Sequence, residues 1–148
     1  MSRTALVIGY GNPLRGDDGI GQAAVQAYAD EAADGGIEVL CCHQLMPELA
    51  ERLAVVDLVV FVDAAAGSPP GSVVTTRLQA SRGSSSGFAH HVDPGVLLAM
   101  SGTLYGRLPE AYLVSVGTES FALGEGLSAA VTAALPEIMA ALRRLVQG

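Results

Sequence analysis

Residues 4–21 read TALVIGYGNPLRGDDGIG, and this stretch sets the pattern for the whole chain. Its first residues, 4–9, are mostly β-branched or aliphatic, which is typical of a buried strand. A glycine-rich turn follows, and residues 19–33 then place apolar side chains at helical spacing. The stretch therefore predicts a strand, a loop and a helix in direct succession.

The same alternation recurs along the rest of the chain. We expect strands at residues 37–42, 58–62, 72–77 and 111–116, and helices at residues 47–54, 94–101 and 128–146. Asp93 is expected to cap the helix at 94–101, and Pro136 to kink or break the helix at 128–146. Residues 79–91 are rich in serine and glycine and predict a loop. Alternating strands and helices favour a parallel sheet with right-handed crossovers. We therefore predict an α/β fold of three layers, a mostly parallel twisted sheet of about five strands with helices on both faces, forming a single domain over residues 1–148.

Composition excludes several classes of protein. Half of the 148 residues are hydrophobic and 16% are charged, which argues against a disordered acidic chain. The net charge is -7 and all eight basic residues are arginines, so nucleic acid is a poor partner and the lysine of a P-loop is missing. The longest apolar run, residues 55–66, is interrupted by two aspartates and is too short to cross a membrane.

The chain start and the cysteines both indicate a reducing compartment. The first residues lead straight into a strand and show no signal-peptide pattern, so we expect the protein in the cytoplasm. Cys41 and Cys42 are adjacent, and neighbouring cysteines rarely form an unstrained disulfide. We therefore expect two reduced thiols.

Two carboxylates lie in the loop between the first strand and its helix. A glycine-rich turn after a strand is typical of dinucleotide-binding folds, but the third position after Gly11 is Leu14 instead of glycine. Asp17 and Asp18 would moreover repel a pyrophosphate at this position. Two roles stay open for them, as a helix cap or as a carboxylate that points into a cleft, and both can hold at once.

Asp63 follows a run of apolar residues and is predicted to lie at the carboxyl end of a buried strand. An ionised aspartate there costs free energy unless it is hydrogen-bonded, paired or bound to a cation. The competing interpretation is a residue that only forms the turn after the strand. Asp57 precedes the same strand, so we expect a turn role for it at the opposite sheet edge.

The three histidines complete the set of polar candidates. His90 and His91 follow the serine-rich loop, and a histidine at such a position is usually structural or exposed. Ligands of parallel sheets, however, bind outside the carboxyl ends of the strands, where the aspartates are also expected. Two carboxylates and one imidazole suit a divalent cation and leave coordination positions open for catalysis. His43, after the second strand, is a further candidate for a polar group of this site.

These residues together resemble the hydrogenase maturation proteases, peptidase family M52. The resemblance rests on the block Gly-x-Gly-Asn-x-Leu-x-x-Asp-Asp-Gly-x-Gly at residues 9–21, on Asp63 at a strand end and on a histidine before a leucine-rich helix. It covers almost the whole chain, including residues 114–120 and 126–128. One departure is Cys-His-Gln-Leu-Met-Pro at residues 42–47, where many members have a glycine-rich turn. We expect this departure to affect substrate recognition.

The resemblance implies a cytoplasmic endopeptidase that removes a C-terminal extension from a nickel-loaded precursor, the large subunit of a nickel-iron hydrogenase. We expect the protein to be a monomer. In that family three side chains contact the metal and serve catalysis, and they carry over here as Asp18, Asp63 and His90. His90 is preferred over His91 because it places the following apolar residues in register with the family. The nickel is carried by the substrate, so no tightly bound metal is expected in the isolated protein.

Two functions from different classes are compatible with these residues. As an enzyme, the chain would hydrolyse a peptide bond, with the metal or a carboxylate activating water. As a binding module, the same three residues would sense or deliver nickel for hydrogenase assembly without any cleavage. Incubation with a nickel-loaded precursor separates the two hypotheses.

Overall fold

The computed structural model describes residues 3–32, 36–81, 92–121, 123–124 and 126–148. Its elements, in chain order, are β1 (Ala5–Tyr10), the short 3-10 helix η1 (Gly16–Gly19), α1 (Ile20–Glu31), β2 (Ile37–Cys42), α2 (Leu49–Leu53), β3 (Leu58–Ala65), β4 (Val73–Arg77), α3 (Pro94–Tyr105), β5 (Glu110–Gly117) and α4 (Ala129–Gln147). The strands form one sheet in the order β2-β1-β3-β5-β4.

The sheet is parallel except at one edge. β1 pairs in parallel with β2 and β3, and β3 pairs in parallel with β5. β4 pairs with β5 in the antiparallel direction and forms one edge of the sheet. The α/β fold class with a mostly parallel sheet of five strands is therefore confirmed.

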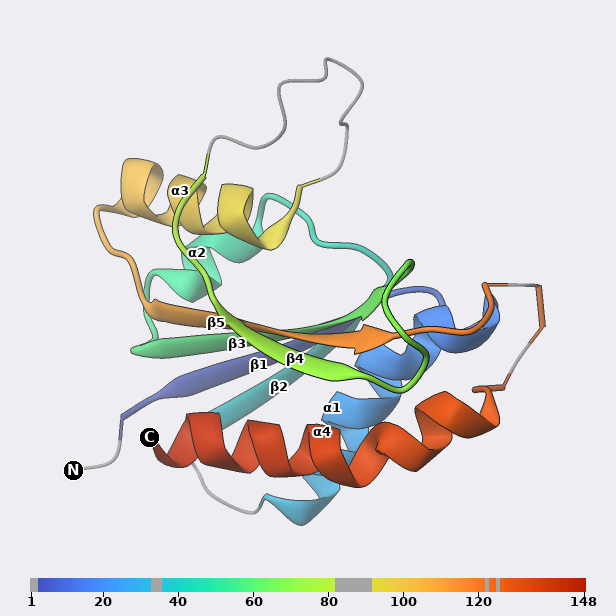
Figure 1. Cartoon of the computed structure of the whole chain (residues 1–148). Helices are drawn as coiled ribbons and strands as arrows, with labels where there is room; N and C mark the ends of the chain where they lie inside the picture. Colours follow the sequence, from blue (N-terminus) through green and yellow to red (C-terminus); the bar gives the residue numbers. More distant parts are fainter. Residues whose placement is uncertain (1–2, 33–35, 82–91, 122, 125) are drawn as a thin grey trace.

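Helices cover both faces of the sheet (Figure 1). Successive side chains of a strand point to opposite faces. On one face, Val7 and Val60 pack in a buried cluster with α1 and α4. On the other, Ile8 and Phe61 pack with α2 and α3. Each fully buried aliphatic or aromatic side chain contributes about 1.5–3 kcal/mol, so these two clusters supply the main stabilisation of the three layers. Among the described helices, none has the length and apolar character needed to span a bilayer.

Several element boundaries differ from the expected ones. α2 is shorter than predicted, and α3 runs four residues beyond Ser101. It ends where Gly106 adopts the left-handed conformation, with φ of 74°, that terminates many helices. α4 continues through Pro136 without the break considered above. β3 extends past Asp63 to Ala65, because residues 63–65 keep their pairing with β5.

Two glycines allow α1 to approach the sheet closely. A Cβ atom on Gly9 of β1 would lie 2.1 Å from the carbonyl oxygen of Gly21 in α1. A Cβ atom on Gly21 would lie 2.5 Å from the carbonyl oxygen of Val62 and 2.7 Å from that of Tyr10. The contacting atoms belong to the backbone and cannot swing away. Glycine is thus required where the first helix crosses the ends of β1 and β3.

The Gly21→Ala substitution should therefore destabilise the protein, although alanine is otherwise the better helix former. We expect a loss of about 3 kcal/mol, the upper range for overpacking, and a thermal midpoint lower by roughly 10 °C. Gly36→Ala is the matched control, since its Cβ atom would meet only the Arg3 carbonyl oxygen at 3.6 Å. Equal midpoints for the two variants in thermal unfolding would contradict the close packing.

Candidate functional site

The carboxyl ends of β1 and β3 lie side by side in the middle of the sheet. Gly9 pairs with Val62, so the loop after Tyr10 leaves the sheet next to Asp63. This edge is on the right in Figure 1, where α1 begins. The topology therefore brings together the two acidic positions that are far apart in the sequence.

Asp63 is half-buried and is held by a neighbour on β1. Its Oδ2 atom accepts a hydrogen bond of 2.9 Å from the Tyr10 hydroxyl. Burial raises the pKa of the Asp63 carboxyl to about 6, while the hydrogen bond from Tyr10 opposes this rise and the charge of Asp18 adds to it. Asp63 is therefore more than a turn former, because it is a desolvated carboxylate close to a second one.

Asp18 is placed by the loop that follows β1. Its Oδ2 atom accepts a hydrogen bond of 2.7 Å from the backbone N–H of Asn12. Gly11 has φ of 138°, and a Cβ atom there would lie 2.1 Å from the Asp18 carbonyl oxygen. The glycine thus lets the loop fold back on η1, which fixes Asp18 at the same edge as Asp63.

Asp17 points away from Asp18 and has a structural role. It is 1% exposed, and its carboxylate accepts hydrogen bonds from the N–H groups of Ser128 (2.7 Å), Glu119 (2.8 Å) and Ser120 (3.2 Å), and from the Ser128 hydroxyl (2.9 Å). Burial disfavours its ionised form, but the hydrogen bonds from Ser128 and Glu119 outweigh burial and lower the pKa of Asp17. Asp17 therefore joins the acidic loop to the start of α4.

The alternative that one of the two aspartates caps α1 is wrong. Neither η1 nor α1 has a side-chain hydrogen bond at its N-cap position. The side chain of Asp17 instead reaches the loop after β5, and that of Asp18 reaches back to Asn12. The two neighbouring aspartates therefore have different roles, because their side chains point in different directions.

His90 and His91 lie outside the described residues. The start of α3, which follows them in sequence, is described: Asp93 caps this helix by accepting a hydrogen bond of 2.8 Å from Val96 N–H. Burial, then the charge of Asp63, raises the pKa of Tyr10, and the charge of Asp93 contributes to the same rise. The start of α3 is therefore close to Tyr10 at the carboxyl edge.

The remaining polar candidates lie after β2. His43 is exposed, and Cys41 and Cys42 are free thiols, as expected for adjacent cysteines. Within the described ranges, no group of three or more histidine, cysteine or acidic residues is arranged to hold a metal ion. Asp18 and Asp63 thus form a pair of carboxylates and not a complete metal site by themselves.

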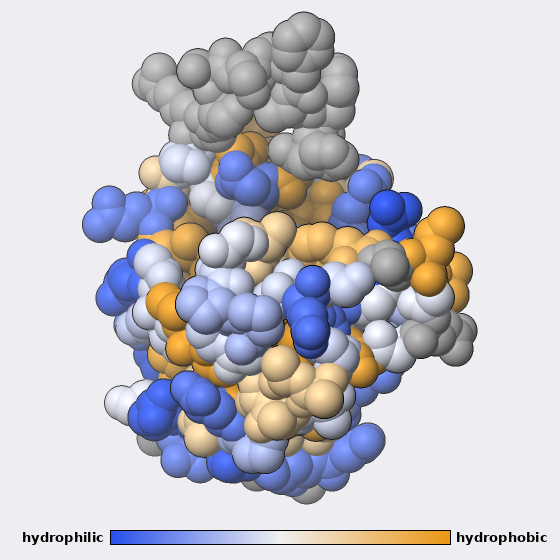
Figure 2. Space-filling view, turned by 45° about the vertical axis from the view of Figure 1, so that its right-hand side comes forward, coloured by the Kyte–Doolittle hydropathy of each residue, from blue (hydrophilic) through white to orange (hydrophobic). Residues whose placement is uncertain are grey.

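A shallow hollow of about 230 Å³ lies beside the acidic loop. It is lined by Gly16, Asp17, Ser120, Leu123, Gly124, Gly126, Leu127 and Ser128. Backbone hydrogen bonds from Gly16 N–H and Gly124 N–H tie the two loops together at 3.0 and 2.8 Å. Figure 2 brings the right-hand side of Figure 1 forward and shows apolar surface among hydrophilic side chains. Leu14 and Leu123, in the two loops that these hydrogen bonds join, are 52% and 80% exposed. The edge thus offers apolar contacts beside its carboxylates.

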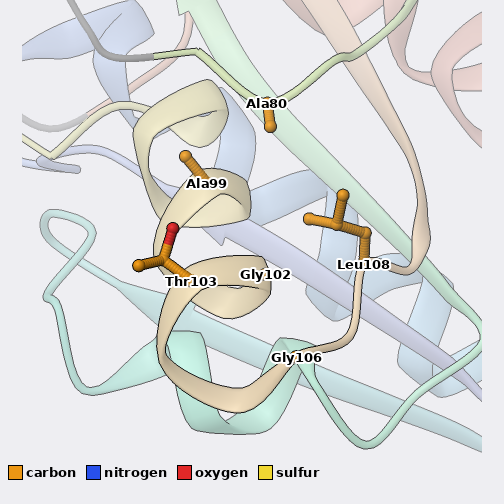
Figure 3. Close-up of a pocket in the computed structure, with 6 residues that line it drawn as sticks. All are labelled: Ala80, Ala99, Gly102, Thr103, Gly106 and Leu108. Carbon is orange, nitrogen blue, oxygen red and sulfur yellow. The ribbon is translucent and has the colours of Figure 1, made fainter.

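A larger hollow of about 410 Å³ lies elsewhere. It is bounded by Ala80 and by residues at the end of α3 and after it (Figure 3): Ala99, Gly102, Thr103, Gly106 and Leu108. The neighbouring Arg107 forms an ion pair with Asp57, which precedes β3. The hollow is therefore near the opposite edge of the sheet and does not contain the predicted site.

The carboxylate pair has two chemical abilities. Carboxylate oxygens bind hard and borderline divalent cations. In addition, a carboxyl group with a pKa of about 6 exchanges its proton close to neutral pH, which is the property of a general base that activates water. Both abilities suit metal-assisted hydrolysis.

No protein-family model matches the chain, and no curated protein sequence matches it significantly. Solved structures do match. The hydrogenase maturating endopeptidase HybD from E. coli is 25% identical, with a TM-score of 0.75 over 95% of this chain and 93% of that one. The chain is a structural relative of the hydrogenase maturation endopeptidases. The resemblance stated from the sequence is thereby confirmed.

Two further maturation proteases share this fold. HycI from Thermococcus kodakarensis, a [NiFe] hydrogenase maturation protease, has a TM-score of 0.80 at 19% identity and is matched over 99% of this chain and 94% of that one. HybD from the same organism has a TM-score of 0.75 at 23% identity, over 97% and 99% of the two chains. The maturation-endopeptidase fold thus covers nearly the whole chain.

Proposed function

We propose that the protein is an endopeptidase that removes the C-terminal extension of a nickel-loaded [NiFe]-hydrogenase large-subunit precursor. The observation that carries this proposal is the pairing of Asp18 and Asp63 at the carboxyl edge of a maturation-endopeptidase fold. Open parallel sheets bind their ligands at this edge. The precursor's scissile bond would lie against the two carboxylates.

The nickel ion belongs to the substrate in this proposal. Asp18, Asp63 and His90 would contact it, so that only a precursor that has received its nickel is processed. Support comes from the two carboxylates and from the place of α3, whose first residues lie near Tyr10 at the same edge. The bound nickel would supply Lewis-acid chemistry, and the carboxylates would orient the metal and accept a proton.

The test is incubation with purified precursor, with and without nickel, followed by mass spectrometry of the products. We expect two fragments from the nickel-loaded precursor and none from the nickel-free form. A nickel-delivery module would leave both precursors intact. Cleavage of both forms at equal rates would contradict recognition through nickel.

The isolated protein should hold no tightly bound metal. Two carboxylates and one imidazole from the chain leave one position of a four-coordinate nickel, and up to half of a six-coordinate shell, to be supplied by other ligands. Elemental analysis after purification should therefore find well under one metal ion per chain. Stoichiometric nickel or zinc that survives mild chelation would instead indicate a self-contained metallopeptidase.

A further inference from the structure

Tyr10 and Asp63 occupy equivalent places at the ends of the two central strands. Alternation along β1 puts Leu6, Ile8 and Tyr10 on the face covered by α2 and α3. Alternation along β3 puts Phe61 and Asp63 on that same face. Tyr10 and Asp63 therefore lie on the same face of the sheet, at the end of this hydrophobic cluster that is next to the carboxyl edge.

The Tyr10 ring is held firmly by its surroundings. It packs edge-on against Phe61, with ring centroids 6.5 Å apart and planes at 85°. Edge-to-face contacts of this kind are favourable and directional. The strand backbone fixes the other end of the side chain, since Tyr10 pairs with Cys42 on β2. The position of the Tyr10 hydroxyl relative to Asp63 is therefore fixed by the packing of the ring and by the strand backbone.

We propose that the Tyr10 hydroxyl is a positioning group, which holds the Asp63 carboxylate in one orientation for the cleavage step. This inference rests on the proposed endopeptidase function. The terminal torsion of an aspartate is broad, so an unrestrained carboxylate turns over a wide range of angles. The 2.9 Å hydrogen bond from Tyr10 to Oδ2 restricts that freedom, together with a backbone hydrogen bond from Ala64, and so sets the direction in which the carboxylate faces the precursor's nickel and water.

The substitution Tyr10→Phe removes only this hydroxyl and keeps the ring against Phe61. A hydrogen bond to a charged group is stronger than one between neutral groups, and we expect kcat for the nickel-loaded precursor to fall about tenfold when it is lost. KM should stay within about twofold, because the phenol acts on Asp63 and not on the precursor. Crystal structures should show one orientation of the Asp63 carboxylate in the wild type and a rotated or divided one in the variant.

Tyr112→Phe is the matched control. The Tyr112 hydroxyl also donates to a carboxylate, Glu110 Oε2, at 2.8 Å, but Glu110 begins β5 at the opposite end of the sheet. Its removal should leave kcat unchanged. The proposal is overturned if both variants lose activity equally, if Tyr10→Phe cleaves at the wild-type rate or raises only KM, or if its Asp63 carboxylate keeps the wild-type orientation. Failure of the wild-type protein to cleave any precursor would instead refute the proposed function.

Discussion

The Asp63→Asn variant should lose cleavage of the nickel-loaded precursor by about a hundredfold or more, while its folded state becomes more stable at neutral pH. Asparagine keeps the volume and an oxygen that accepts the Tyr10 hydrogen bond. It lacks the charge that a divalent cation binds and the basic oxygen that takes a proton from water. Cleavage and stability are therefore expected to change in opposite directions.

The gain in stability has a defined pH window. The pKa of Asp63 in the folded protein is about 6, above the ordinary value of 3.8, so the folded state binds the proton more tightly than the unfolded state does. Wild-type stability should fall as the pH rises between about 4 and 6, and the asparagine variant should escape this fall. Because the carboxylate is only partly buried, we expect a difference of about 1–2 kcal/mol above pH 6 and almost none at pH 4.

Asp57→Asn is the control at the other end of β3. Asp57 accepts a hydrogen bond of 2.9 Å from Thr4 N–H and forms an ion pair with Arg107, and these contacts lower its pKa. Its charge stabilises the folded protein at neutral pH, and this contribution is lost as the pH falls below the ordinary value of 3.8. Asp57→Asn should hence melt slightly lower and cleave normally. Near-normal cleavage by Asp63→Asn, or equal loss in both variants, would refute the catalytic role.

Asp17→Asn should produce the largest loss of stability among the acidic residues of the loop. Its buried carboxylate accepts four hydrogen bonds, from Glu119, Ser120 and both polar groups of Ser128. The amide group of an asparagine would replace one acceptor oxygen by an NH2 group, so that some of the N–H and O–H groups that now bind Asp17 would have no acceptor. We expect a loss of about 3–4 kcal/mol and a thermal midpoint lower by roughly 10 °C.

The substitution Asp18→Asn at the neighbouring position should instead keep the stability of the protein and lose its cleavage activity. Asp18 is half-buried and accepts one described hydrogen bond, from Asn12 N–H, which asparagine can also accept. Its thermal midpoint should stay within about 2 °C of the wild type, while precursor cleavage falls steeply. Thermal unfolding and a cleavage assay at 20 °C separate the two effects. A normal midpoint for Asp17→Asn, or a large decrease for Asp18→Asn, would show that the roles of the two aspartates are assigned wrongly.

Local sequence patterns predicted most of the fold because the strands are apolar, short and separated by clear helical patterns. The position of Asp63 near the carboxyl end of β3 was likewise visible, since it follows directly on buried residues, although the strand continues to Ala65. The predicted ends of helices were less accurate. The sequence pattern predicted that α3 ends at Ser101, but the helix continues to Tyr105 and is terminated by Gly106. No local pattern shows that α4 continues through Pro136, whereas in the structure Ala134 and Ile138, on either side of this proline, are both buried in the cluster shared with α1.

The role of Asp17 could not be predicted from neighbouring residues, because its hydrogen-bond partners lie 102 to 111 residues away in sequence. The contact between Tyr10 and Asp63, in contrast, could have been predicted from the sequence. The alternation Leu6, Ile8, Tyr10 on one strand and Phe61, Asp63 on the next, combined with parallel pairing, was enough to suggest that the hydroxyl and the carboxylate share a face. The assignment of His90 stays a prediction.

The long separation between Asp17 and Ser128 also determines when the site is completed during synthesis. A ribosome makes the acidic loop early, but the N–H and hydroxyl groups that bind the Asp17 carboxylate emerge only with the start of α4, 111 residues later. Until then this carboxylate remains hydrated and its loop lacks the anchor that holds η1 in place. A nascent chain would carry both Asp18 and Asp63 long before it could align them, so processing activity should begin only after α4 has docked.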